Sequence, residues 1–411
     1  MKILDIYLHE KKIGQIHSFP GKINYFLFEK DYLQDPKSAT LSLSFKDKIT
    51  SMMASKKIPQ LRPIQIKLPS FFSNLLPEAE MREYLAKRVH LRPENEFDLL
   101  AALGLDLPGA IRAISHEDHN PQSTAKEITK RKMNRNLYSS ENSLHFSLAG
   151  IQLKFSALFN TQKQMTIGAS GIGGNWIIKL PSFRFPYMPE NELAMMLLAK
   201  KVGINVPKVS LITIDSINNL PPIAKFSNEK NAFIINRFDR SINGPIHMED
   251  FAQVFGLYPK DKYSKINYKN IAEVLWTQIG SHAVEEFIKR LVFNMLIGNA
   301  DMHAKNWSLI YPDKIHPELA PAYDFISTIC YLPDDKMALN LVKEKRWDQI
   351  NMNSFISFAN KIKFPVNVIL NTIQQTVELF HQCWEEEKKN INLPKEFIRI
   401  IDNHQKSIDL K

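Results

Sequence analysis

Residues 283–311 read AVEEFIKRLVFNMLIGNADMHAKNWSLIY and join a predicted helix to a predicted strand through a short polar loop. The apolar residues recur at the spacing of one helix face, namely Phe287, Ile288, Leu291, Val292 and Met295. Gly298 ends this pattern, as glycine commonly does at a helix C-terminus. WSLIY, after the loop, is typical of a strand. We therefore expect Asp301 to occupy a rigid position just past the end of a well-anchored helix.

The polar loop and a later segment contain residues suited to phosphate chemistry. Asn306 follows Asp301 in the loop, and Asp324 lies in the later segment LAPAYDF. Two carboxylates and an amide oxygen are the hard ligands that Mg²⁺ prefers when phosphates complete its coordination shell. An Asp that does not bind the metal could accept a hydroxyl proton. The order Asp, four residues, Asn, then a later Asp before Phe is that of a kinase catalytic loop and metal aspartate.

Two alternatives stay open at this loop. Asp and Asn are frequent in turns because their side chains bond to nearby backbone groups. The spacing of Asp301 and Asn306, taken alone, is therefore more often chance than catalysis. His303 has no second His or Cys nearby, which favours a role in orienting the loop over a role as metal ligand.

An upstream strand and helix supply a candidate phosphate contact. Lys179 follows Ile177 and Ile178, and an amine beside apolar residues is costly unless it is paired or faces phosphate. Glu192 opens the helical segment NELAMMLLAKK. Kinases use such a Lys and helix Glu ion pair to hold nucleotide phosphates. Taken alone, a Lys at a strand edge is more often a surface residue.

The composition limits the class of protein. The chain has 411 residues, 44% hydrophobic and 23% charged, which is typical of a globular protein of two or three domains. MKILDIYLHEKK lacks an uncharged secretory core, and no apolar stretch reaches the roughly 20 residues that cross a bilayer. With only Cys330 and Cys383, we expect a reduced, cytoplasmic compartment and no membrane partner. A net charge of +10 favours acidic partners such as nucleic acid, nucleotides or an acidic protein.

Periodicity along the chain predicts an α+β fold. The first 28 residues alternate apolar and polar positions, as half-buried strands do, and two helical patterns follow until Gly104 and Pro108. Residues 115–143 are polar and are read as a linker or mobile excursion, with the basic run KRKMNR more simply a solvated loop than a phosphate contact. Strand patterns with one helix come next, and from about residue 248 the pattern is helical.

These segments together resemble the HipA family, the serine/threonine kinase toxins of bacterial type II toxin–antitoxin pairs. The resemblance covers nearly the whole chain and rests on ordered motifs: LPSFFSNLLPEAEMREYLAKRV, FSLAGIQLKFSA, WIIKLP, INRFDR, HMEDFAQVFGLYP, GNADMHAKNWSLIY and APAYDF. It implies a protein-kinase-like two-lobed fold with a β-rich N-terminal subdomain and an α-helical C-terminal lobe. The expected divisions are a HipA-type N-terminal subdomain at 1–113, a polar linker or insert at 114–143, a kinase N-lobe at 144–240 and an α-helical C-lobe at 241–411.

The resemblance also implies roles for the residues at the centre of the site. Asp301 looks like the catalytic base, and Asn306 and Asp324 look like the magnesium ligands. Lys179 looks like the ATP phosphate contact, with Glu192 as its partner.

Other residues match positions around the nucleotide. Lys154 and His303 resemble residues near the phosphates. The segment from Asn236 to Phe238 resembles the hinge whose backbone binds adenine. Ser147 matches the family's autophosphorylated serine, in a loop that closes on ATP when ordered and is ejected when phosphorylated.

Cofactors and partners follow from the same resemblance. It implies ATP and Mg²⁺, a small helix-turn-helix antitoxin (HipB-like) through which the pair binds operator DNA, and a protein Ser/Thr substrate of which an aminoacyl-tRNA synthetase is the best-known example. A second hypothesis is a non-catalytic corepressor that stabilises an antitoxin on DNA. The occupied catalytic positions favour the kinase. Ser139, Ser140 and Ser143 are further candidate acceptors, or only linker composition.

Overall fold

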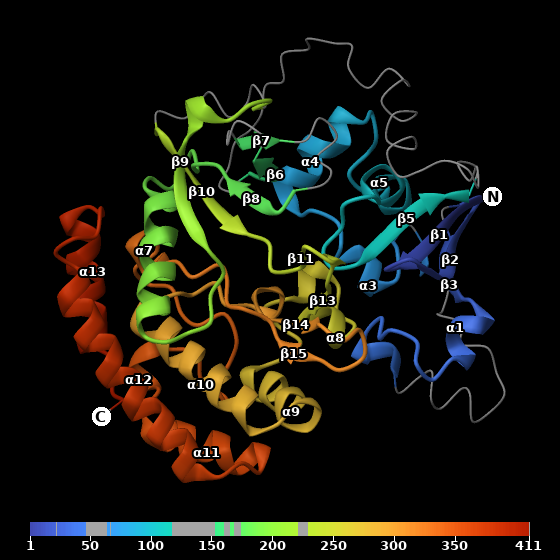
Figure 1. The fold of residues 1–411 in the computed structure, drawn as a ribbon. Coiled ribbons are helices and arrows are strands. Elements are labelled where there is room, and N and C mark those ends of the chain that lie inside the picture. The colour runs from blue at the N-terminus through green and yellow to red at the C-terminus, as the bar shows by residue number, and fades with distance from the viewer. Residues whose placement is uncertain are drawn as a thin grey trace.

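The computed structural model describes residues 1–21, 23–46, 64–65, 67–116, 153–159, 165–167, 174–220 and 229–410. These residues form an N-terminal subdomain, a lobe built on a second sheet, and a large helical lobe (Figure 1). In that view the N-terminal subdomain lies on the right, the second sheet at the top and the helical lobe at the lower left. The mixed helix and sheet content confirms the predicted fold class.

The N-terminal subdomain is built on an antiparallel sheet in the order β4-β3-β2-β1-β5. Its strands are β1 (Lys2–Leu8), β2 (Lys11–Phe19), β3 (Ile23–Phe28), β4 (Ile64–Gln65) and β5 (Ile111–Ser115). Its helices are α1 (Lys30–Gln34), α3 (Ser70–Ser73), α4 (Ala79–Arg88) and α5 (Glu96–Leu103). Leu4, Ile6 and Leu8 of β1 lie in its core at the predicted period of two, and the intervening Asp5 is also buried. From α3 and α5, Phe72 and Leu100 are buried in the same core.

The second lobe contains the antiparallel sheet β7-β6-β8-β10-β9 and one long helix. Its strands are β6 (Lys154–Phe159), β7 (Met165–Ile167), β8 (Trp176–Lys179), β9 (Val209–Thr213) and β10 (Asn231–Asn236). The helix α7 (Met188–Lys201) packs against β9 and β10 and buries Met195 and Leu198. The chain turns at Gly203 with a φ of +82°, the left-handed conformation that glycine adopts most easily.

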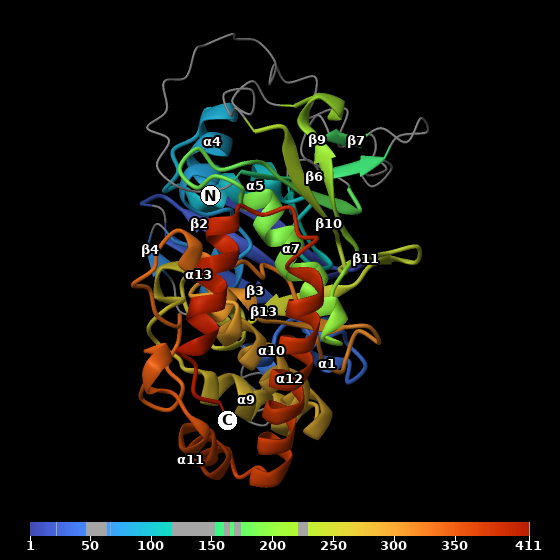
Figure 2. The same cartoon turned by 90° about the vertical axis from the view of Figure 1, so that its left-hand side faces the viewer.

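The helical lobe is centred on α10 (Ser281–Leu296), whose residues Phe287, Leu291 and Phe293 are fully enclosed. Around it lie α8 (Phe251–Val254), α9 (Tyr268–Gln278), α11 (Met352–Ile362), α12 (Val366–Glu387) and α13 (Lys395–Lys406). Figure 2 shows α12 and α13 on the outer side of α10. A small sheet of β13 (His247–Asp250), β14 (Ser308–Tyr311) and β15 (Glu318–Leu319) and the hairpin of β11 (Arg240–Ser241) and β12 (Gly244–Pro245) complete the lobe.

The start of the helical lobe differs from the prediction. Helical periodicity was expected from about residue 248, but residues 247–250 form β13, which pairs with β14. The helix begins only after Asp250, whose side chain accepts a hydrogen bond from the backbone N–H of Gln253 at 2.8 Å. This capping interaction fixes where the strand ends and α8 begins.

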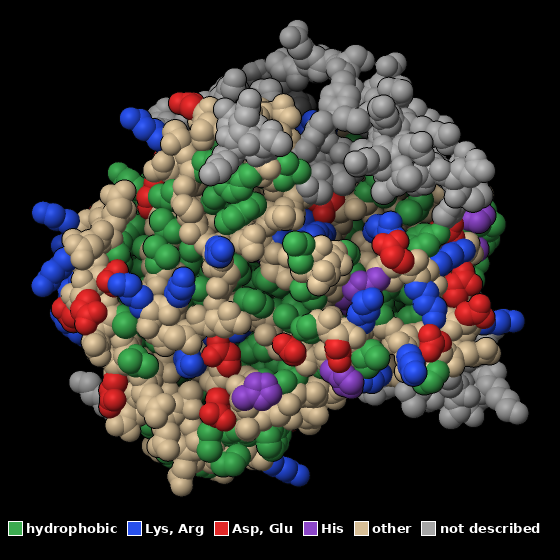
Figure 3. Space-filling view, in the orientation of Figure 1, with side chains coloured by type: hydrophobic (Ala, Val, Ile, Leu, Met, Phe, Trp, Pro, Cys, Tyr) green, Lys and Arg blue, Asp and Glu red, His purple; other side chains and the backbone are tan. Residues whose placement is uncertain are grey.

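The surface in Figure 3 mixes acidic and basic side chains. Where this face is described, Lys and Arg lie among Asp and Glu instead of forming one basic patch. Among the described ranges, each helix is too short or too polar to span a bilayer.

Candidate active site

Lys179 lies at the end of β8 and forms the central ion pairs of the site. Its Nζ is 2.5 Å from Glu192 Oε1 on α7 and also contacts the Asp324 carboxylate. Lys179 and Glu192 are buried, so the predicted contact between strand and helix is present inside the lobe. Burial alone would lower the pKa of Lys179, but the negative charges of Asp324 and Glu192 raise it. The amine therefore stays charged.

A second lysine lies beside the first. Lys154 on β6 is directly opposite Lys179 on β8 in the antiparallel register. Such partners project from the same face of a sheet, where like charges repel each other. Burial would raise the pKa of Asp324, but the positive charges of Lys179 and Lys154 hold it well below its usual range. Because Lys154 is exposed, this face of the sheet is suited to bind a further anion such as phosphate.

A tight turn after α10 directs the loop that contains Asp301. Gly298 has a φ of +63°, and a Cβ added there would lie 2.5 Å from the side chain of Ile329. The buried Asn299 follows: its Oδ1 accepts from the backbone N–H of Asp301, and its Nδ2 donates to the carbonyl oxygen of Asp324, both at 3.1 Å. One amide therefore ties together the backbones of the two acidic residues.

The Asp301 carboxylate accepts a close hydrogen bond from a tyrosine. Tyr263 donates its hydroxyl to Asp301 Oδ1 at 2.5 Å. Although about half of the Asp301 side chain is exposed, the protein around it removes enough hydration to raise its pKa. The hydrogen bond from Tyr263 and the charge of Lys262 oppose this shift. A raised pKa suits a group that takes up a proton during reaction.

His303 lies buried beside Asp301. Its Nδ1 accepts from the backbone N–H of Lys305 at 3.3 Å, and its Nε2 is 3.9 Å from Asp301 Oδ1. Burial lowers the pKa of His303 to about 3, so the ring is neutral near pH 7. These contacts hold the ring against the loop, and its role in orienting the loop stays a prediction. Within the described ranges, no three His, Cys, Asp or Glu side chains gather as a metal site.

Asn306 and Asp324 provide a donor set that fits Mg²⁺ with phosphates. Asn306 Nδ2 donates to the carbonyl oxygen of Asp301 at 2.8 Å, which directs the amide so that its Oδ1 could serve as a metal ligand. Asp324 has a φ of +57°, an uncommon conformation for a residue other than glycine. Its lowered pKa keeps the carboxylate ionised. One carboxylate and one amide oxygen suit an ion that keeps part of its shell for waters and phosphate oxygens.

The N-terminal subdomain supports the same loop. Glu78, just before α4, accepts hydrogen bonds from Lys305 Nζ at 2.5 Å and from Lys262 Nζ at 2.8 Å. Burial alone would raise the pKa of Glu78, but the charges of Lys305 and Lys262 lower it to about 2. The loop is therefore anchored from outside the two kinase-like lobes.

The predicted hinge lies at the far end of the β8–β10 pair. Asn236 is opposite Trp176, three positions from the pair that contains Lys179, or roughly 10 Å along the strands. The Phe238 ring packs against the Tyr323 ring with centroids 5.7 Å apart. This contact connects the hinge to the residue before Asp324.

Two hinge N–H groups already have partners in the protein. Asn236 N–H donates to the carbonyl oxygen of Lys208, and Arg237 N–H donates to that of Asn175, both at 2.8 Å. Of the three predicted hinge residues, only Phe238 has an N–H without a bonded acceptor in the described part of the chain.

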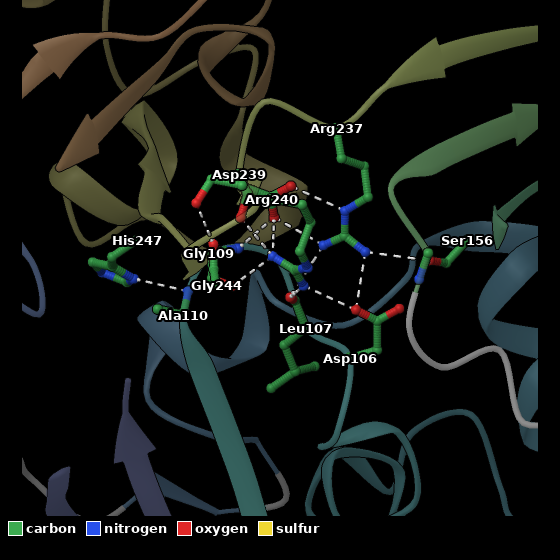
Figure 4. Close-up of polar contacts among 12 residues, drawn as sticks. Asp106, Leu107, Gly109, Ala110, Ser156, Arg237, Asp239, Arg240, Gly244 and His247 are labelled. Carbon is green, nitrogen blue, oxygen red and sulfur yellow. Dashed lines mark hydrogen bonds and ion pairs between the residues drawn. The ribbon is translucent and has the colours of Figure 1, made fainter. Parts of the chain in front are cut away.

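Four charged residues form a largely buried cluster next to the hinge. We call Asp106, Arg237, Asp239 and Arg240 the hinge cluster; Figure 4 shows both guanidinium groups reaching toward Asp106. Asp106 Oδ1 accepts from Arg237 Nη1 and Arg240 Nη2, both at 2.9 Å. Asp239 Oδ2 accepts from both arginines at 2.8 Å. Two positive and two negative charges balance inside the protein.

The structure brings most of the predicted site residues into one region: Lys154, Lys179, Glu192, Asp301, His303, Asn306 and Asp324. Asn236 and Phe238 lie at the other end of the same sheet. Ser147 lies outside the described residues. The roles assigned to all of these residues remain predictions.

Three supporting residues were not predicted from the sequence. Asn299 stands within the GNAD motif, and its place between Gly298 and Asp301 was the available signal. Tyr263 and Glu78 gave no comparable signal, because Glu78 lies 227 positions from Lys305 and Tyr263 lies 38 from Asp301.

Comparisons with known proteins give consistent results. The HipA N-terminal domain family matches residues 4–114, and the HipA-like C-terminal domain family matches residues 146–384. Y4dM from Sinorhizobium fredii, whose name marks it as a candidate kinase, is 41% identical over 99% of this chain and 97% of its own length. The serine/threonine-protein kinase toxin HipA from Shewanella oneidensis is 25% identical over 78% of this chain and 77% of its own.

A solved structure shows the same fold. The chain is similar to a structure of the S. oneidensis toxin–antitoxin system that contains HipA, HipB and operator DNA, with a TM-score of 0.73 and 21% identity. The match covers 98% of this chain and 95% of that one. The two-lobed, kinase-like fold that the sequence predicted is therefore confirmed.

Proposed function

This chain belongs to the HipA family, and from that premise we propose that it is a serine/threonine protein kinase that uses ATP and Mg²⁺. The observation that carries the proposal is the contact of Lys179 with both Glu192 and Asp324, beside the exposed Lys154. In protein kinases a Lys paired with a helix Glu contacts the nucleotide phosphates, and a later Asp binds the metal.

The nucleotide is assigned along the β8–β10 pair. Lys154 and Lys179 receive the phosphates, whose negative charge offsets the repulsion between the two amines. The base lies toward the segment from Asn236 to Phe238. The Phe238 N–H is our candidate donor to adenine, because the other two N–H groups of this segment are occupied.

Asp301 is assigned as the catalytic base. Its carboxylate accepts the proton of the substrate hydroxyl, while Tyr263 and the turn at Asn299 hold it in place. Asn306 and Asp324 would hold Mg²⁺, which supplies positive charge for the transferring phosphoryl group. His303, neutral and buried, orients the loop.

The proposed cellular role is that of a growth-inhibiting toxin. The S. oneidensis relative is named as a kinase toxin, and a structure of HipA with HipB and operator DNA is known from that organism. For this chain we propose a HipB-like helix-turn-helix antitoxin, operator DNA bound through it, and a cytoplasmic protein substrate such as an aminoacyl-tRNA synthetase. Ser147 is the proposed site of autophosphorylation.

Labelled-phosphate transfer tests the proposal. The purified full chain is incubated with γ-labelled ATP and Mg²⁺, and incorporation at Ser147 is followed by mass spectrometry. We expect Asp301→Asn to lower transfer by at least 100-fold, in line with the roughly 10²–10⁴ that a positioned base contributes. ATP binding, followed by thermal shift, should be retained because Asp301 does not contact Lys179.

A matched variant separates chemistry from folding. Asp313→Asn changes another exposed carboxylate, in the turn after β14, and should leave transfer unchanged. Equal transfer by wild type and Asp301→Asn would contradict the role of Asp301. Absence of ATP turnover in wild type, together with antitoxin-dependent DNA binding, would favour the corepressor hypothesis.

A further inference from the structure

The hinge cluster joins the hinge to the N-terminal subdomain, which lies outside the two lobes that bind nucleotide in our proposal. From this geometry we propose that the N-terminal subdomain positions the nucleotide hinge, with Asp106 as the positioning residue. The inference rests on the proposed ATP binding and adds a residue that does not touch the nucleotide.

The turn after α5 provides acceptors for both arginines. Asp106 Oδ1 binds Arg237 and Arg240, and the Leu107 carbonyl oxygen accepts from Arg240 Nη2 at 2.9 Å. The Gly109 carbonyl oxygen accepts from Arg240 Nη1 at 2.9 Å. As Figure 4 shows, these acceptors face the segment that follows β10. Three acceptor residues of one turn therefore hold the side chains of Arg237, in the hinge, and Arg240, just after it.

The same turn is fixed from its other side. The Gly109 N–H donates to Asp239 Oδ2 at 2.8 Å. Gly109 has a φ of +73°, and a Cβ there would lie 2.7 Å from the backbone nitrogen of Met248 in β13. The turn thus has little freedom to move relative to the hinge or to the helical lobe.

Arg237 connects these contacts with the turn after α5 to the proposed adenine site. Its backbone N–H is bonded to Asn175, and its guanidinium group reaches Asp106, Asp239 and Ser156 Oγ. Its neighbours Asn236 and Phe238 are the other residues of the proposed hinge. Because main chain and side chain of Arg237 are both held, the Phe238 N–H is held in a fixed direction.

The negative charge of Asp106, and not its shape alone, holds Arg237 and Arg240 in place. The side chains of Asp106 and Arg237 are only 6% and 7% exposed. Without the Asp106 charge, two arginines share one carboxylate in a buried place, where an uncompensated charge is costly. The arginines then move toward water, and the hinge moves with Arg237.

Nucleotide binding by Asp106→Asn tests the inference. The dissociation constant for ATP is measured by calorimetry with the full chain and Mg²⁺, and KM and kcat by phosphate transfer. We expect binding to weaken roughly tenfold and KM to rise in parallel, with a smaller change in kcat, because coupling through side chains is of this order. Asp106→Glu keeps the charge and should recover part of the affinity.

Asp5→Asn is the matched control, because Asp5 is also a buried, ion-paired carboxylate of the N-terminal subdomain but contacts β2 instead of the hinge. It should leave the affinity for ATP unchanged. Unchanged affinity in Asp106→Asn, or equal losses in both variants, would overturn the inference alone. If wild type binds no ATP, the proposed function fails and the inference with it. Should Asp106→Asn fail to fold, Asp106→Glu must still bind ATP more weakly than wild type.

Discussion

At the scale of single residues, Lys179 shows how a buried, charged side chain is stabilised. A buried amine loses hydration that it cannot recover from apolar neighbours. Here Glu192 and Asp324 replace that hydration, and the pKa of Lys179 rises in spite of burial. Removing one member of such a group leaves the others as uncompensated charges.

Lys179→Met should therefore be strongly destabilising. We expect a loss of roughly 3 kcal/mol in the free energy of unfolding, measured by urea titration, because two carboxylates lose their cation. Adding Glu192→Gln to this variant should recover part of the loss, since one uncompensated charge is then removed.

An exposed lysine provides the comparison for this prediction. Lys201 forms an ion pair with Glu387, and about half of its side chain is exposed to water. Lys201→Met should change stability little, because exposed pairs contribute little. A similar loss in both single variants would argue against charge burial as the cause.

At the scale of elements, glycines end two helices in different surroundings. Gly298 after α10 and Gly203 after α7 both have positive φ. A Cβ at Gly298 would collide with Ile329, whereas nothing lies within 4 Å of a Cβ at Gly203. The first turn leads directly to Asp301, and the side chain of Ile329 limits the space around it.

Gly298→Ala should cost about 3 kcal/mol, because it adds steric overlap to the strain of a left-handed residue. Gly203→Ala carries only the backbone strain and should cost about 1 kcal/mol. Urea unfolding of both variants measures the difference. Equal costs would show that Ile329 moves aside easily, and that the turn before Asp301 is less constrained than the structure indicates.

The pattern of residues within a single segment predicted these elements. It could not predict features that depend on contacts between segments far apart in the sequence. The apolar face of α10 and its end at Gly298 follow from spacing and composition within one segment. The strand β13 was missed because four residues, HMED, carry too little alternation, and its pairing with β14 lies about 60 positions away. The hinge cluster was missed for the same reason, since Asp106 and Arg237 are 131 positions apart.

The candidate site was predictable where one segment holds several of its groups. Asp301 and Asn306 share a loop, and their order with Asp324 gave a recognisable pattern. The contact of Lys154 with the site required the strand register, which places it opposite Lys179. The contact of Glu78 with the loop could not be predicted, because the sequence around a carboxylate in another subdomain does not indicate which lysines it binds.

At the scale of the whole molecule, one histidine lies at the junction of the N-terminal subdomain and the helical lobe. His247 on β13 is fully buried; its Nε2 donates to the Leu41 carbonyl oxygen at 2.8 Å, and its Nδ1 accepts from the Ala110 N–H at 3.4 Å. A second proton on this ring would face the Ala110 N–H, a donor. Burial accordingly lowers the pKa of His247 to about 4.

The pH dependence of stability follows from this shift. Because the pKa of His247 is about 4 when folded and about 6.5 when unfolded, the unfolded chain binds more protons between these values. Stability is therefore lost as the pH falls through this window, and His247 should contribute a decrease of about 2 kcal/mol from pH 7 to pH 5. His303, whose pKa is also lowered, adds to the decrease in wild type.

Urea unfolding of His247→Gln at pH 7 and pH 5 tests this prediction. The free energy of unfolding should fall by about 2 kcal/mol less in this variant than in wild type. His316→Gln, at an exposed position, should show the full decrease of wild type. The same decrease in His247→Gln as in wild type would show that protonation of His247 does not control the stability of the junction.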